Sequence, residues 1–250
     1  MTRLHEVAAG LLVATSRTDS LNSVVILGQN GDVLLVDPGW QQDELDDLAD
    51  ELSARSLKPV VGLATHAHHD HLFWHPDFGD VPRWASPDTV RIAGSHRDEL
   101  LAALGDGYRA EVLALTGRVS ALPGLDIPWL GPEADVLLHN AHIVGHSAVW
   151  IAELGVLVAG DMLSDVELPL PDDSSNALSE YRIGLEMLAP YASVARFVIP
   201  GHGSLTTDGA ARIDADRRYL DDLIAGRGST DARIGNPGMA KIHAENLALA

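Results

Sequence analysis

The sequence predicts an α/β fold, because strand-forming and helix-forming segments alternate along the chain. Two strand–turn–strand patterns, at residues 23–37 and 148–161, predict β-hairpins. Amphipathic stretches at 41–55, 177–188 and 208–224 predict helices. We therefore expect layers of sheet covered by helices.

The two predicted hairpins resemble each other. Each consists of a β-rich run, a tight turn, a second β-rich run and an aspartate, which is Asp37 in the first and Asp161 in the second. The first turn contains Asn30-Gly31, and both of these residues tolerate the positive φ of a hairpin turn. This repetition predicts two similar halves that each contribute a sheet.

The helices and the remaining strands follow from the spacing of apolar residues. Leu45, Leu48 and Leu52 lie at helical intervals, and the acidic residues around them indicate a solvated surface. Apolar runs at 60–64 and 196–199 predict buried strands, and each run ends just before histidine-containing loops. We expect a single domain over 1–250 with a short helical tail from about residue 208.

Composition narrows the functional classes. The chain has 250 residues, no cysteine and a formal charge of −19, so disulfides and thiolate metal ligands are excluded. The 17 Lys and Arg residues are scattered, which disfavours nucleic acid as a partner, and no apolar run reaches the roughly 18 residues of a membrane span. Without a recognisable signal peptide we expect a cytoplasmic protein with a small-molecule substrate; its oligomeric state is not indicated.

The 12 histidines exceed what packing requires, and they include the densest motif of the chain, His66-Ala67-His68-His69-Asp70-His71. This motif follows a predicted buried strand. His66 and His68 are two residues apart, so their side chains can point the same way and bind one cation. Asp70 and the following His71 are displaced sideways, which suits a second cation.

This motif matches the HxHxDH pattern of the metallo-β-lactamase-fold superfamily. Further along, Gly145-His146-Ser147 resembles the family's histidine turn, Gly160-Asp161 resembles its bridging aspartate, and Gly201-His202 resembles its last histidine. The resemblance extends from about residue 21 to residue 202. It implies a four-layer αββα sandwich with two divalent metal ions, for which zinc is preferred and iron or manganese is acceptable. It also implies seven metal ligands: His66, His68 and His146 for the first ion, Asp70, His71 and His202 for the second, and Asp161 between them.

Several neighbouring residues have two interpretations. Asp37 either orients a ligand histidine or caps its loop, and His142 either reaches the edge of the site or is structural. Phe73 and Trp74 stand where the family has a small residue, so they either line a substrate pocket or pack under the metal loop. His69 occupies a variable position of the motif and is expected to be exposed or to contact a ligand. The remaining histidines are expected to be ordinary: His5, His75, His96, His139 and His243.

The resemblance implies a hydrolase that acts on a small-molecule ester, lactone or thioester, with a metal-bridging hydroxide as nucleophile and Asp70 and Asp161 as catalytic carboxylates. Asp161 disfavours β-lactamase activity, because most metallo-β-lactamases have Cys or Ser at that position. Ser164 differs from the tyrosine of the lactonase branch, and the short acidic tail disfavours glutathione thioesters. Two alternatives are a mononuclear iron persulfide dioxygenase, which would use His66, His146 and Asp161, and a non-catalytic metal-binding protein.

Overall fold

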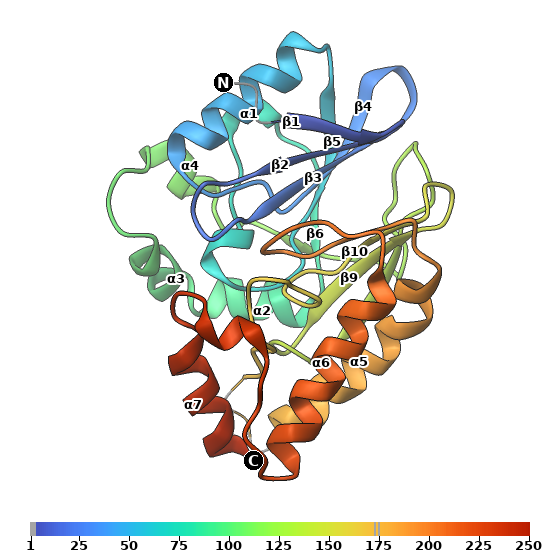
Figure 1. The fold of residues 1–250 in the computed structure, drawn as a ribbon. Coiled ribbons are helices and arrows are strands. Elements are labelled where there is room, and N and C mark those ends of the chain that lie inside the picture. The colour runs from blue at the N-terminus through green and yellow to red at the C-terminus, as the bar shows by residue number, and fades with distance from the viewer. Residues whose placement is uncertain (1–3, 173, 175) are drawn as a thin grey trace.

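Two β-sheets face each other, and helices cover both outer faces (Figure 1). The computed structural model describes residues 4–172, 174 and 176–250. Helix α1 (Gln42–Ala54) lies outside the larger sheet, whereas α5 (Ala177–Val194) and α6 (Gly209–Ile224) cover the smaller one. This arrangement confirms the predicted αββα sandwich. All three helices begin within two residues of the predicted starts, and α5 continues past the predicted end at residue 188 to Val194.

The larger sheet has seven strands in sequence order. The pairs β1–β2, β2–β3 and β3–β4 are antiparallel, and the pairs from β4–β5 to β6–β7 are parallel. The strands are β1 (Leu4–Ala8), β2 (Leu11–Thr15), β3 (Asn22–Leu27), β4 (Asp32–Val36), β5 (Lys58–Leu63), β6 (Arg83–Ala85) and β7 (Ser120–Ala121). The connection from β6 to β7 contains α2 (Pro87–Ser95), α3 (Arg97–Leu104) and α4 (Ala110–Leu115).

The smaller sheet has the order β11-β10-β9-β8, in which only β10 and β11 are parallel. Its strands are β8 (Asp135–His139), β9 (His146–Ile151), β10 (Val156–Val158) and β11 (Phe197–Ile199). The β3–β4 hairpin belongs to one sheet and the β9–β10 hairpin to the other, as predicted. At the first turn, Asn30 and Gly31 adopt φ values of 56° and 84°, the left-handed geometry that this residue pair favours.

Alternating side chains build the layers of the core. Val24 and Ile26 of β3 face the smaller sheet, while Val25 between them packs toward α1. In the other sheet, Val156 and Val158 face inward, while Leu157 packs toward α5 and α6. Burial on both faces explains why these strands are almost continuously apolar.

The chain ends with the short 3₁₀ helix η4 (Ala232–Gly235) and α7 (Met239–Leu249), which lies apart from the main layers (Figure 1). Side chains from this part of the chain, including Met239, join the apolar cluster under α5 and α6. Among the described residues, no helix is both long and apolar enough to cross a bilayer.

Candidate metal centre

The buried histidines and aspartates converge from loops of both sheets. In the larger sheet, Asp37 follows β4, and residues 66–71 follow β5. In the smaller sheet, Asp161 follows β10 and His202 follows β11, each close behind the carboxyl end of its strand. A further loop between β8 and β9 contributes His142. The fold thus collects residues that are far apart in the sequence into one site.

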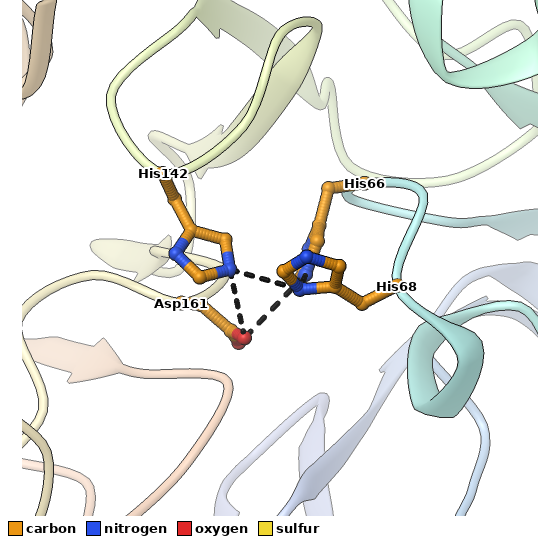
Figure 2. Close-up of side chains that lie close together, drawn as sticks. All are labelled: His66, His68, His142 and Asp161. Carbon is orange, nitrogen blue, oxygen red and sulfur yellow. Dashed lines mark hydrogen bonds and ion pairs between the residues drawn. The ribbon is translucent and has the colours of Figure 1, made fainter. Parts of the chain in front are cut away.

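The first group consists of His66, His68, His142 and Asp161, whose ligand atoms lie within 4.8 Å of one another. Figure 2 shows the four side chains pointing toward a common centre. His68 Nδ1 lies 3.0 Å from His66 Nε2 and 3.0 Å from His142 Nε2. Three imidazole nitrogens and a carboxylate are a donor set suited to a divalent transition metal.

The second group consists of Asp70, His71 and His202, all buried. Asp70 and His71 lie on the 3₁₀ helix η2 (His69–His71), and the His71 ring lies 4.1 Å from that of His66, between centroids. His202 Nε2 lies 3.2 Å from Asp70 Oδ2 and 3.4 Å from His71 Nε2. This is the second donor set that the sequence predicted.

The Asp161 carboxylate lies between the two groups. Its Oδ2 is 3.4 Å from His66 Nε2 and 3.5 Å from His202 Nε2, and its Oδ1 is 3.1 Å from His71 Nε2. A Cβ atom on Gly201 would come within 2.0 Å of Asp161 Oδ1, so only glycine allows the carboxylate to occupy this position. Asp161 is therefore placed to contact both groups at once.

His146 differs from the sequence prediction. Its Nε2 accepts a hydrogen bond from the backbone N–H of Asp161 at 3.0 Å, and its Nδ1 lies 3.3 Å from His139 Nε2. A nitrogen whose lone pair accepts this hydrogen bond is not free to bind a metal. His146 is the first residue of β9, whereas His142 lies in the preceding loop and reaches the first group. The geometry thus assigns to His142 the place predicted for His146.

Outer contacts fix the orientation of the rings. His71 Nδ1 lies 2.9 Å from Asp37 Oδ2, which favours the ligand-orienting interpretation of Asp37. His142 Nδ1 donates to the carbonyl of Leu170 at 2.7 Å, and His202 Nδ1 donates to the carbonyl of Asp19 at 2.9 Å. In all three rings Nε2 is the nitrogen left to face the site.

Burial and charge divide the histidines into two kinds. Burial lowers the pKa of His68 to about 3 and also lowers the pKa of His66, so both rings are neutral near pH 7. Burial opposes the charged form of His202 too, but Asp161 and Asp70 outweigh it and raise its pKa to about 10. Burial also opposes the charged form of His71, but Asp161, Asp70 and Asp37 outweigh it and raise the pKa of this ring. The buried negative charge thus attracts protons where a cation would fit.

The donor set fits a pair of metal ions. Within the described part of the chain, Asp161 Oδ1 is fully buried and accepts no well-aligned hydrogen bond. The nearest cationic neighbour of this oxygen is His71 Nε2 at 3.1 Å, and metal coordination would give the oxygen a well-aligned partner. In the first group, His68 Nδ1 lies 3.0 Å from Nε2 of both His66 and His142, an arrangement that a shared cation would stabilise.

The predicted substrate residues are buried. Trp74 and Phe73 are each 2% exposed and belong to the apolar cluster between the larger sheet and α1. Trp74 Nε1 donates to the carbonyl of Gly79 at 3.0 Å. This placement favours the packing interpretation, and substrate contact by either ring stays a prediction.

Sequence reasoning missed two residues beside the site. The half-buried Trp40 has its ring 5.5 Å from that of His69 and 6.4 Å from that of His202, between centroids. Burial raises the pKa of the Glu167 carboxyl to about 7, although nearby His202 lowers it. The only available signal was proximity in sequence, since Trp40 follows Asp37 closely and Glu167 follows Asp161.

Comparison with known proteins identifies the family. The model of the metallo-β-lactamase superfamily matches residues 17–225. A β-lactamase domain protein from Burkholderia ambifaria superposes with a TM-score of 0.71 at 22% identity, covering 98% of this chain and 87% of its own. A metallo-β-lactamase family protein from Thermus thermophilus gives 0.68 at 21% identity, with 98% and 93% covered. An inverting sec-alkylsulfatase from Pseudomonas sp. gives 0.67 at 14% identity, with 89% and 42% covered. The match over most of the chain, together with the fold and the two His/Asp groups, shows that this protein belongs to the metallo-β-lactamase superfamily.

Proposed function

We propose that this protein is a dinuclear metal-dependent hydrolase of a small-molecule ester, lactone or thioester. The position of the Asp161 carboxylate between two complete donor groups carries the proposal. The proposed ligands are the sequence-predicted set with His142 in place of His146. When bound, two divalent ions, preferably zinc, would lower the pKa of a shared water and polarise the oxygen of the scissile group.

The protein's own residues then have distinct roles. Asp161 fixes the separation of the two groups, and Asp70 completes the second. Trp40 and His69 border the second group and give it an aromatic wall. This wall, together with the charge of −19, supports a substrate that is neutral or weakly charged and partly apolar.

Metal analysis combined with a hydrolase panel tests the proposal. We expect about two metal ions per chain and turnover of at least one ester, lactone or thioester. Asp161→Ala should abolish turnover and loosen metal binding, whereas His96→Ala, at an exposed histidine outside the site, should leave both unchanged. One equivalent of iron with oxygen-dependent persulfide oxidation would instead identify a dioxygenase. Two bound ions without any turnover would indicate a non-catalytic metal-binding protein.

A further inference from the structure

Side chains of the 231–246 segment hold the backbone of the 164–170 loop, which follows Asp161. Arg233 Nη1 donates to the carbonyls of Ser164 and Glu167, both at 2.9 Å. Further hydrogen bonds to this loop come from Asn236 (to Val166 O, 2.7 Å), Asn246 (to Pro169 O, 2.8 Å) and Met239, whose Sδ accepts from Leu168 N at 3.3 Å. The loop has no helix or strand of its own, so these contacts supply partners that regular structure would otherwise give.

The same loop contacts a histidine of each donor group. At one end, the hydroxyl of Ser164 donates to the carbonyl of His202 at 2.8 Å. At the other end, the carbonyl of Leu170 accepts from Nδ1 of His142 at 2.7 Å. A displacement of this loop would therefore move or rotate one proposed ligand of each metal.

Arg233 is itself firmly fixed. Its side chain is 8% exposed and lies 2.7 Å from Asp216 Oδ1 on α6. Asp231 binds it through two further contacts, Nε to Oδ1 at 3.0 Å and Nη2 to Oδ2 at 2.7 Å. The planar guanidinium thus binds Asp231 through Nε and Nη2, while Nη1 is shared between Asp216 Oδ1 and the two loop carbonyls. Lysine cannot reproduce this geometry.

We infer that Arg233, assisted by Asn246, is a positioning residue for the metal centre. It acts through the 164–170 loop on the orientation of His142 and His202, and it touches neither metal nor substrate. The inference rests on the proposed metal centre. It assigns to the 231–246 segment a role in setting metal geometry in addition to its packing.

Cobalt-substituted protein provides the test, because the visible spectrum of Co²⁺ reports ligand geometry independently of turnover. The variants are Arg233→Lys, which keeps a positive charge beside Asp216, and Asn246→Ala, which removes two neutral contacts, one to the carbonyl of Pro169 and one to the hydroxyl of Tyr219. Arg217→Lys is the matched control, since Arg217 also binds two carboxylates, Glu186 and Asp214, but lies on the exposed side of α6. Co²⁺ affinities are measured by chelator competition, and hydrogen exchange of the Leu168 amide is followed in metal-free protein.

We expect Arg233→Lys to remain folded, to shift the Co²⁺ spectrum and to weaken Co²⁺ binding by about tenfold, the lower end of typical outer-contact effects. Asn246→Ala should change the Co²⁺ spectrum and the Co²⁺ affinity in the same direction but to a smaller extent. Hydrogen exchange of the Leu168 amide should accelerate in both variants. Wild-type spectra and affinities in both variants would overturn the inference, as would equal changes in Arg217→Lys. Failure of the wild-type protein to bind Co²⁺ would refute the metal centre itself. In that case the exchange of the Leu168 amide still tests the loop contacts in metal-free protein. An exchange rate unchanged in both variants would show that Arg233 and Asn246 do not restrain the 164–170 loop.

Discussion

The Asp37 carboxylate lies 2.9 Å from Nδ1 of His71, on the side of the imidazole opposite the second donor group. Asp37 is itself held by Thr65, whose backbone N–H and hydroxyl donate to it at 2.8 Å and 2.7 Å. Thr65 therefore fixes the position of the carboxylate, and the carboxylate in turn orients the His71 ring so that its Nε2 faces the site.

This relationship predicts that Asp37→Ala weakens binding of the second metal by about 10- to 100-fold while the first metal is retained. Stepwise metal titration with a chromophoric chelator measures the two affinities separately. Equal weakening of both metals would show that Asp37 supports the whole loop rather than the His71 ring.

His142 and His146 should respond differently to substitution by alanine. His142→Ala is expected to lose the first metal, because Nε2 is one of the four donors proposed for it. His146→Ala should keep both metals but lose about 1–3 kcal/mol of stability, because the buried N–H of Asp161 loses its acceptor. Elemental analysis and urea unfolding distinguish the two variants, and the reverse pattern would restore His146 as the ligand.

Metal binding at the second group should release about two protons near pH 7.5, one each from His71 and His202. In the metal-free protein the pKa of both residues is raised, for His202 to about 10. Their contribution to stability is complete below the unfolded pKa of about 6.5 and is lost as pH rises toward 10. The metal-induced rise in Tm should therefore grow over this interval.

Calorimetry in buffers of different ionisation enthalpy counts the released protons. The number of protons released on metal binding should be smaller in His202→Ala than in the wild-type protein. Proton release that is absent at pH 7.5 in the wild-type protein would show that both rings are already neutral.

Alanine variants of Trp40 and Trp74 should show which ring contacts substrate and which ring packs in the core. Trp40→Ala is expected to lower kcat/KM for substrates with an apolar part, which corresponds to a rise of about 1–3 kcal/mol in the activation free energy. The change in stability should be small. Trp74→Ala should cost about 3–5 kcal/mol of stability, because the ring fills the cluster between the larger sheet and α1. An ester and lactone series of varied chain length checks the ranking, and a ranking altered only by Trp74→Ala would support its role as a pocket wall.

Much of the fold was predictable because local patterns determine it. The hairpin at Asn30-Gly31, the leucines of α1 and the apolar runs of β5 and β11 all fall where the sequence indicated. The proposed site was identified differently: the dense His/Asp motif at 66–71 pointed to metal, and Asp161 and His202 were assigned through the resemblance to the metallo-β-lactamase-fold superfamily.

The rest depends on contacts that local sequence does not encode. His142 and His146 flank one turn, and the choice between them depends on β9 beginning at His146. The burial of Trp74 depends on α1 lying over the same face of the sheet. The hydrogen bond from Arg233 to the carbonyl of Ser164 joins residues that are 69 positions apart. No sequence pattern near either residue predicts this contact.

The origin of the donor atoms has a mechanical consequence. Residues 66–71 belong to the half of the chain that builds the larger sheet, whereas His142, Asp161 and His202 belong to the half that builds the smaller one. Bound metal would thus act as a removable cross-link across the sandwich in a chain that has no cysteine. The two sheets could then separate during unfolding only after the metal had dissociated. A chelator would therefore destabilise this protein much as a reductant destabilises a disulfide-bonded one.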